Sequence, residues 1–273
     1  MENTNSSFSD TGIRDNLAAV KNKLIVLSGK GGVGKSTVAV NLAVLLEQKG
    51  LRVGLLDTDI HGPNVAKMLG LEGKNILADE NRRIKPYRVY KNLEVISLAF
   101  LLPSSDKPVV WRGPLKTSLI RQFLSDVEWG ELDYLIIDSP PGTGDEPLSV
   151  CQLVPNLNMA IVVTTPQEVA LLDVRKSIAF LQELNIPFVG IVENMSGLIC
   201  PYCGKKIDLF KSGSVEKTAE EFGIEFLGKL PLEPEAVVCS DRGQPLVLTD
   251  KAGSFRQVFF AIGEKIRKHE NSA

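Results

Sequence analysis

Residues 29–36 read Gly-Lys-Gly-Gly-Val-Gly-Lys-Ser, and they follow the apolar run Leu-Ile-Val-Leu at residues 24–27. The glycines let the backbone curl so that several N–H groups point at one phosphate, and the helix that begins here adds the positive end of its dipole. In such a loop Lys35 reaches the β- and γ-phosphates and the Ser36 hydroxyl binds Mg²⁺. This strand–loop–helix context predicts a nucleotide site rather than a flexible Gly-rich turn. The residues expected to bind the nucleotide here are Gly29, Lys30, Gly31, Gly32, Val33, Gly34, Lys35, Ser36 and Thr37.

Lys30 is a second cation beside the phosphates, and the general pattern does not require it. It cannot easily share the space of Lys35 within one loop, so it is expected to reach phosphates bound by a partner chain. A charge-assisted contact of this kind is worth roughly 1.5–3 kcal/mol and would exist only with nucleotide bound. Lys30 therefore points to a homodimer that ATP tightens or reshapes, and a solvated lysine is the alternative.

Composition restricts the class of protein. A chain of 273 residues can bury roughly 75% of its unfolded surface, which suits one large α/β domain. The net charge of −2 gives no global field toward nucleic acid or acidic lipid, so neither is expected as a partner. Residues 1–11 do not read as a secretory signal, and no apolar run approaches the roughly 18–20 residues that span a bilayer. We therefore expect a cytoplasmic protein, in which the four cysteines are thiols or metal ligands.

Apolar runs alternate with helical stretches along the chain. Several runs are apolar throughout, as expected of parallel strands that are covered on both faces. The predicted fold is therefore α/β, a mostly parallel sheet with helices on both faces. Residues 1–22 are expected to form a flexible polar segment, and residues 23–273 a single domain. The predicted strands are residues 24–27, 53–56, 93–98, 134–137, 160–163, 188–192 and 226–230, and the predicted helices are residues 35–49, 115–127, 168–184 and 214–222.

Two stretches do not fit this alternation. Residues 72–91 are polar and charged, and residues 101–114 carry three prolines. Both are expected to be surface loops.

Acidic residues follow two of the predicted strands, at the carboxyl ends where parallel sheets bind their ligands. Asp57 and Asp59 follow residues 53–56, and Asp138 follows residues 134–137. An acid directly after an apolar strand can hold Mg²⁺, and Asp138 fits that role. Asp57 or Asp59 is expected to orient or deprotonate the attacking water, and the sequence does not separate the two. The alternative is that these acids are loop residues or helix caps.

Cys200 and Cys203 are separated by two residues in the run Cys-Pro-Tyr-Cys-Gly, a tight turn that can grip one metal ion or cluster. Dithiol redox enzymes use this spacing at the start of a helix, but the residues after Gly204 do not read as one. A zinc site needs four ligands, and Cys151 and Cys239 are isolated in the sequence. Two chains related by a two-fold axis would supply four thiolates, which suit zinc or an iron–sulfur cluster. Two ordinary buried cysteines are the remaining alternative.

Together these motifs resemble the Mrp/ApbC group of iron–sulfur cluster carrier ATPases, which are relatives of MinD and ParA. The resemblance spans nearly the whole chain. It rests on the phosphate loop, residues 57–63, Trp-Arg-Gly-Pro at 111–114, residues 133–145, Glu-Asn-Met-Ser at 193–196 and the cysteine pair.

The resemblance implies a MinD-like P-loop NTPase fold with a deviant phosphate loop, and it assigns roles to residues. Lys30 would enter the partner's nucleotide site, and Asp59 rather than Asp57 would position the attacking water beside Lys35. Asn194 would hydrogen-bond adenine, with Pro231 packing beside the base. The implied metal ligands are Ser36 and Asp138 for Mg²⁺ and Cys200 and Cys203 for a 4Fe–4S cluster shared across a homodimer.

The implied activity is slow, switch-like ATP hydrolysis by a carrier that passes its cluster to iron–sulfur apoproteins and works with cluster assembly factors. One rival is a positioning ATPase of the MinD or ParA type, which would need a basic face or an exposed amphipathic tail. Residues 254–268 carry apolar residues at helical spacing, but such a stripe more often packs on its own sheet. A third possibility is an ATPase dimer in which the cysteine pairs hold a structural zinc, as aerobic purification would favour.

Overall fold

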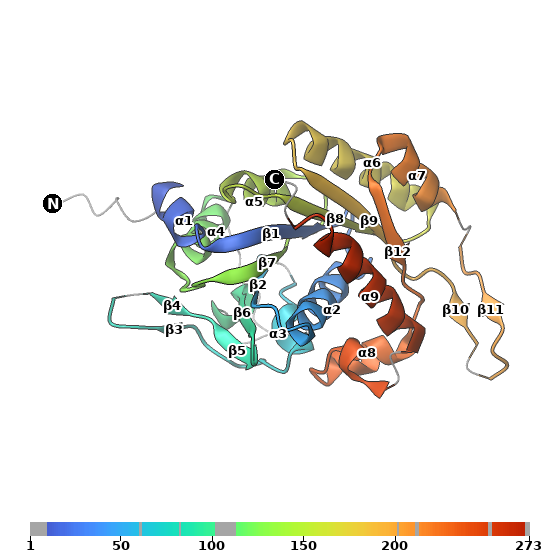
Figure 1. Cartoon of the computed structure of the whole chain (residues 1–273), viewed down its shortest axis with the longest axis horizontal. Helices are drawn as coiled ribbons and strands as arrows, with labels where there is room; N and C mark the ends of the chain where they lie inside the picture. Colours follow the sequence, from blue (N-terminus) through green and yellow to red (C-terminus); the bar gives the residue numbers. More distant parts are fainter. Residues whose placement is uncertain are drawn as a thin grey trace.

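The computed structural model describes residues 10–59, 62–81, 83–101, 113–200, 202–210, 213–250 and 253–270. Its main feature is an eight-stranded sheet with the strand order β12-β9-β8-β1-β7-β2-β6-β5 (Figure 1). Every pairing is parallel except that of the edge strand β5 with β6. The expected fold is confirmed. The strands are β1 (Val20–Leu27), β2 (Val53–Asp57), β5 (Tyr87–Tyr90), β6 (Leu93–Ser97), β7 (Leu132–Asp138), β8 (Met159–Thr164), β9 (Phe188–Glu193) and β12 (Glu225–Lys229).

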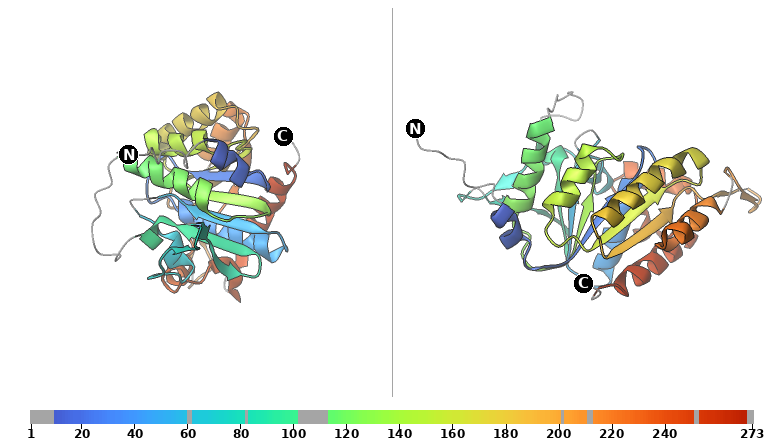
Figure 2. Two further views of the ribbon diagram at one scale, coloured as in Figure 1. Left: turned by 90° about the vertical axis from the view of Figure 1, so that its left-hand side faces the viewer. Right: turned by 90° about the horizontal axis from the view of Figure 1, so that it is seen from above.

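Helices cover both faces of this sheet, and Figure 2 shows α4, α5 and α6 on one face and α2 and α9 on the other. The central strands are therefore buried on both sides, which explains why their sequences are apolar throughout. The helices are α1 (Asp10–Asn16), α2 (Lys35–Gln48), α3 (Val65–Met68), α4 (Gly113–Asp126), α5 (Asp145–Leu153), α6 (Glu168–Glu183), α7 (Ser214–Phe222), α8 (Pro234–Asp241) and α9 (Gly253–Arg267), with short 3₁₀ turns η1 (Leu98–Leu101) and η2 (Leu246–Leu248).

The start of the chain differs from the flexible segment expected over residues 1–22. Residues 1–9 lie outside the described residues, but α1 and the first residues of the strand β1 fall within the expected segment. Ile13 and Leu17 are buried, one helical turn apart, and the Asn16 side-chain amide donates to the Leu124 and Val127 carbonyls. These hydrogen bonds fasten the end of α1 to α4, so the regular structure begins well before residue 23.

Of the two stretches expected to be surface loops, the first contains regular structure and most of the second lies outside the described residues. Residues 72–91 contain β3 (Leu77–Ala78), β4 (Ile84–Lys85) and β5 rather than a loop alone. β5 pairs with β6, and the Tyr87 ring meets Phe100 edge-on at 5.0 Å between centroids, which anchors this polar stretch to the core. In the second stretch, residues 102–112 lie outside the described residues, and they include Trp111 and Arg112.

The apolar stripe near the C-terminus belongs to the core. Phe255, Phe259, Ile262 and Ile266 of α9 are all buried, and α9 packs against α2 and β12. The exposed amphipathic tail that a membrane-positioning protein would need is therefore not formed by this helix. Within the described part of the chain, no helix combines the length and apolar character needed to cross a bilayer.

Candidate functional site

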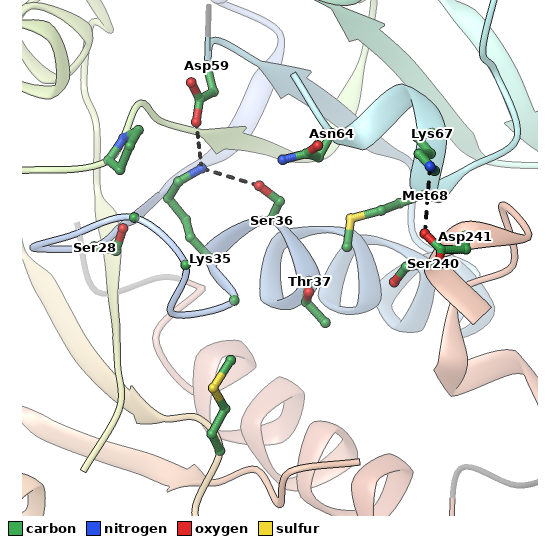
Figure 3. A pocket seen from close by; sticks show the side chains of 15 residues that line it. Ser28, Lys35, Ser36, Thr37, Asp59, Asn64, Lys67, Met68, Ser240 and Asp241 are labelled. Atoms are coloured by element: carbon green, nitrogen blue, oxygen red, sulfur yellow. Dashed lines mark hydrogen bonds and ion pairs between the residues drawn. The ribbon is translucent and has the colours of Figure 1, made fainter. Parts of the chain in front are cut away.

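A cavity of about 400 Å³ opens at the carboxyl ends of the central strands, where the loop after β1 meets the loops after β2 and β7. Figure 3 shows Lys35, Ser36 and Asp59 at one end of it and Lys67, Ser240 and Asp241 at the other, with Thr37 and Met68 between. Its lining residues are Ser28, Gly31, Gly32, Gly34, Lys35, Ser36, Thr37, Asp59, Asn64, Lys67, Met68, Pro141, Met195, Ser240 and Asp241.

The phosphate loop has little room for side chains on its inner turn. Gly34 precedes α2 with φ of 86°, and a Cβ there would lie 2.1 Å from Asn194 Nδ2. The Asn194 amide in turn donates to the Val33 carbonyl over 2.8 Å, so the end of β9 is fastened to the loop. Gly34 is therefore required both for its left-handed backbone and for the close approach of Asn194.

Lys35 brings three of the predicted side chains together. Its side chain is 6% exposed, and Nζ donates to Asp138 Oδ1 over 2.7 Å. The same nitrogen lies 3.9 Å from Asp59 Oδ2 and 3.4 Å from Ser36 Oγ. A buried ammonium within reach of two carboxylates is held at the point where the phosphate loop would place phosphate oxygens.

Asp138 ends β7 and is fully buried. Its Oδ1 accepts from Lys35, whereas Oδ2 has no hydrogen-bond partner among the described residues. A buried carboxylate oxygen without a donor is an expensive arrangement unless a cation or bound water satisfies it. Together with the Ser36 hydroxyl it forms an oxygen donor set of the kind that Mg²⁺ prefers, so the residues present fit that ion.

Asp57 lies beside Asp138 as its register partner on the neighbouring strand, and it is also fully buried. Burial, and then the negative charge of Asp138, raises the pKa of Asp57 to about 8. Its oxygens accept the Asp59 N–H over 3.1 Å, the Val65 N–H over 3.4 Å and the Ser97 hydroxyl over 2.9 Å. Asp57 thus holds the backbone of the loop, whereas Asp59 is the acid that lines the cavity.

Lys30 leaves the phosphate loop on the side of α6. Its Nζ donates to Gln167 Oε1 over 3.1 Å, and Gln167 is the residue that caps the start of α6. The loop also touches this helix through Gly29, where a Cβ would lie 2.6 Å from Asp173 Cβ. Lys30 and Lys35 therefore point to different places.

A second cavity of about 250 Å³ adjoins the first and is mostly apolar. It includes both residues expected beside the base, Asn194 and Pro231, together with several that the sequence did not suggest. Met195 takes a left-handed backbone with φ of 57°, which is unusual for methionine and is a sign of a constrained site. The full lining is Gly34, Thr37, Met68, Asn194, Met195, Pro231, Leu232, Glu233, Ala236, Val237, Ser240, Asp241 and Phe255.

The cysteine pair lines neither of these cavities and lies on a small hairpin made of β10 (Leu198–Ile199), β11 (Lys206–Ile207) and the turn between them. This cysteine hairpin projects from the body of the molecule (Figure 1). The Cys200 N–H donates to the Lys205 carbonyl, and the Gly204 N–H returns to the Cys200 carbonyl, both over 2.9 Å. Pro201 lies outside the described residues.

The hairpin turn favours a thiolate at Cys200. The backbone N–H of Cys203, then that of Tyr202, and then the Cys203 thiol lower the pKa of Cys200. Cys200 is half-buried and Cys203 is exposed, so both sulfurs can be reached from outside. Over the described residues no group of three or more His, Cys, Asp or Glu side chains could hold a metal ion, so the pair by itself falls short of the four ligands of a tetrahedral zinc site.

Large apolar side chains surround the pair on the surface. Tyr202 is 97% exposed, and Ile199, Ile207 and Leu209 are each close to half exposed. By contrast, Cys151 and Cys239 are buried in the body of the protein, as isolated structural cysteines commonly are.

Comparison with known proteins agrees with this geometry. A family model described as ParA, NUBPL iron-transfer P-loop NTPase, matches residues 19–267. An iron-sulfur cluster carrier protein of Methanocaldococcus jannaschii is 52% identical over 259 residues, covering 94% of this chain and 89% of the relative. A cytosolic Fe-S cluster assembly factor NUBP2 homolog of Dictyostelium discoideum is 50% identical over 227 residues, covering 82% and 86%.

Solved structures extend the similarity. A nucleotide-binding protein of Archaeoglobus fulgidus in complex with ADP superposes with a TM-score of 0.77 at 38% identity, covering 87% of this chain and 92% of that one. MinD of Pyrococcus horikoshii superposes with a TM-score of 0.67 at 22% identity, covering 92% and 97%, and this shows the shared fold alone. The resemblance inferred from the motifs is confirmed, and the chain belongs to the family of NUBPL-type iron-transfer P-loop NTPases.

Proposed function

We propose that this protein is an ATP-binding and ATP-hydrolysing carrier that holds an iron–sulfur cluster between the two subunits of a homodimer and passes it to apoproteins. The observation that carries the proposal is that one chain joins a complete phosphate site to half of a thiolate site. The names of the relatives support the cargo, and the cytosolic relative supports work in the cytoplasm alongside cluster assembly factors.

The cluster would be held at the cysteine hairpin. Cys200 and Cys203 supply two sulfurs per chain, and a two-fold axis would bring four together. The exposed Tyr202 and its apolar neighbours would then be covered by the second subunit. Four thiolates suit a 4Fe–4S cluster, and they also suit zinc, so the experiment must separate the two metals.

The nucleotide would be bound and hydrolysed at the cavity after β1. The Lys35 ammonium would move from Asp138 to the β- and γ-phosphates, where it would offset the negative charge that grows during phosphoryl transfer. Ser36 and Asp138 would hold Mg²⁺, which neutralises the phosphate oxygens when bound. Asp59 would position the attacking water, because it lines the cavity while Asp57 is fully buried and occupied with the loop backbone.

Lys30 would reach the nucleotide of the partner subunit. Its hydrogen bond to Gln167 is to a neutral acceptor at a half-buried place, and a phosphate oxygen is the stronger acceptor. Exchange of one acceptor for the other would therefore occur only when nucleotide and partner are both present. This makes the slow ATPase a switch on subunit packing.

The two sites are joined by a short, tightly bonded segment. Asn194 meets the phosphate loop, and only five residues separate it from Cys200. Between them the Ser196 N–H donates to the Leu230 carbonyl, and the Leu232 N–H donates to the Gly197 carbonyl, both over 2.8 Å. A change at the nucleotide would thus be felt at the hairpin, which would bias loading or release of the cluster.

The test is reconstitution with iron and sulfide under anaerobic conditions, with and without ATP. Iron, acid-labile sulfide and zinc are measured per protein dimer, together with the absorbance spectrum. The double variant Cys200→Ser/Cys203→Ser is expected to lose the iron and sulfide while it still binds ATP. Lys35→Ala is expected to do the reverse, with weak ATP binding and a full iron load.

The matched control is Cys151→Ala/Cys239→Ala, which removes the other two thiols of the chain and should keep the cluster. A full iron load on the Cys200/Cys203 double variant would refute the site. A bound metal centre on a strictly monomeric protein, measured by light scattering, would refute the shared cluster. Zinc without sulfide after anaerobic reconstitution would favour a structural zinc instead.

A further inference from the structure

The two cavities share one wall. The part of the first cavity away from this wall carries the phosphate loop, Lys35 and Asp59, whereas the second cavity is mostly apolar. A nucleotide has the same order, with phosphates at one end, a planar base at the other and the sugar between. The sugar would therefore lie along the shared wall, which consists of Gly34, Thr37, Met68, Met195, Ser240 and Asp241.

Three residues of this wall have polar side chains, and they differ in position. Thr37 follows Ser36 at the start of α2, which puts it on the phosphate side. Ser240 and Asp241 stand at the far end of the cavity from Lys35, at the end of α8 (Figure 3). The Ser240 hydroxyl donates to the Ala236 carbonyl over 2.7 Å, so its oxygen is left to accept.

Asp241 is the acceptor best suited to a sugar diol. An ionised carboxylate only accepts hydrogen bonds, and ribose offers two adjacent hydroxyl donors. Lys67 Nζ lies 3.6 Å from Asp241 Oδ1, and both residues line the first cavity (Figure 3). Because both side chains are about half exposed or more, this ion pair is weak, and a ligand can compete for the carboxylate.

The backbone, rather than the ion pair, fixes where Asp241 stands. The segments that follow α3 and α8 approach so closely that a Cβ on Gly243 would lie 2.5 Å from Gly70 Cα. Gly243 has φ of 68°, so a glycine here allows both the turn after Asp241 and the close contact that keeps the end of α8 beside α3. The carboxylate is therefore presented at the cavity by packing that a change of its side chain would leave intact.

We propose that Asp241, assisted by Ser240, binds the ribose hydroxyls and makes this protein selective for ribonucleotides over deoxyribonucleotides. The proposal rests on the proposed ATP binding and adds a sugar subsite to it.

The test compares the dissociation constants of Mg-ATP, Mg-2′-deoxyATP and Mg-3′-deoxyATP by titration calorimetry. The wild-type protein is expected to bind ATP roughly tenfold more tightly than at least one deoxy analogue, which corresponds to one hydrogen bond to a charged acceptor. Asp241→Ala is expected to bring this ratio close to one. The ratio is the informative quantity, because removing a negative charge near the triphosphate changes the affinity for all three nucleotides alike.

Glu235→Ala is the matched control, since it removes an acidic side chain of the same helix that lines neither cavity, and it should keep the wild-type ratio. Asp241→Asn keeps the shape and should give an intermediate ratio, which also serves if Asp241→Ala fails to fold. A wild-type protein that binds all three nucleotides equally, or an Asp241→Ala variant that keeps the ratio, would overturn the sugar subsite. Failure of the wild type to bind ATP would instead overturn the proposed function.

Discussion

The nucleotide cavity and the cysteine hairpin are built in opposite ways. The cavity lies at the ends of the central strands β1, β7 and β2, and its key groups are buried, with Lys35 6% exposed and Asp138 fully enclosed. The hairpin is made of two strands of two residues each, and Tyr202 at its turn is 97% exposed. One site is fixed by the folding of the whole sheet, whereas the other is fixed by a local turn.

This difference shows where each site gets its remaining groups. The cavity has its cation, its carboxylates and its hydroxyl within one chain, because burial of the sheet forces these polar groups to satisfy one another. The hairpin offers two thiols and an exposed apolar surface, which in the proposed function a second subunit would complete. A buried site thus tolerates little change, and an exposed site depends on what binds to it.

The largest expected effect comes from replacing one glycine in the nucleotide cavity and one in the cysteine hairpin, and it tests this comparison directly. Gly34 and Gly204 both have positive φ, so an alanine costs roughly 1–2 kcal/mol of backbone strain at either position. At Gly34 the new Cβ also lies 2.1 Å from Asn194 Nδ2, whereas at Gly204 no described atom lies within 4 Å. Urea unfolding should show Gly34→Ala destabilised by several kcal/mol and Gly204→Ala by only the strain.

ATP affinity is the second quantity to measure for these two variants. Gly34→Ala should also lose ATP affinity, because Asn194 is displaced from the Val33 carbonyl. Gly204→Ala should bind ATP as the wild type does and serves as the control. Equal losses of stability in the two variants would contradict the contrast between a packed and an open site.

A smaller effect is expected in the pH dependence of the free energy of unfolding. Among the buried groups around the nucleotide cavity, Asp57 should dominate it. In the unfolded chain this carboxyl ionises near pH 4, whereas in the folded protein its pKa is raised to about 8 by burial and by Asp138. Between these values the folded state binds more protons, so the free energy of unfolding should fall as the pH rises from about 4 to about 8. Asp57→Asn should lack this fall.

Urea midpoints of the wild type and Asp57→Asn, taken between about pH 5 and pH 9, check this prediction. The difference between the two proteins isolates Asp57, because every other titrating group is common to both. The stability of the wild type relative to the variant should decrease toward high pH. A difference that stays constant with pH would mean that Asp57 does not hold its proton in the folded protein.

The smallest effect is expected within the hairpin itself, where the turn favours the thiolate of Cys200. Iodoacetamide should therefore modify Cys200 a few-fold faster than Cys203 near neutral pH, even though Cys203 is the more exposed sulfur. The single variants Cys200→Ser and Cys203→Ser report one thiol each by mass spectrometry. Cys151, whose pKa burial raises to about 12, is the slow internal reference. Faster reaction at Cys203 would show that exposure outweighs the hydrogen bonds of the turn.

Much of the fold could be predicted because the signals are local. All seven predicted strands occur, and the predicted helix at residues 214–222 coincides with α7. Gly50 marks the end of α2 with φ of 83°, as a glycine just past a helix should. The phosphate loop was predictable for the same reason, since its glycines, lysine and serine form one continuous run.

Other elements could not be predicted from the sequence, because tertiary contacts decide whether they form. α8 begins with proline and carries no clear apolar stripe, and only Cys239 of it is fully buried, so its sequence alone reads as a loop. α5 has a proline in its first turn, which also weakens the helical pattern. β5 exists because β6 offers it an edge to pair with. Among the elements that the sequence did not predict, α8 matters most for the site, because it brings Ser240 and Asp241 to the cavity.

The sequence by itself determined the parallel sheet, the phosphate loop and the half-complete thiolate pair, since each depends on residues that are neighbours in the chain. Only the tertiary structure decided which acid faces the cavity, because Asp57 and Asp59 differ in burial and hydrogen bonding rather than in type. It also brought Asn194, Pro231 and Asp241 from distant parts of the chain to one cavity. Such meetings depend on how strands and helices pack, and no local run of residues records that packing.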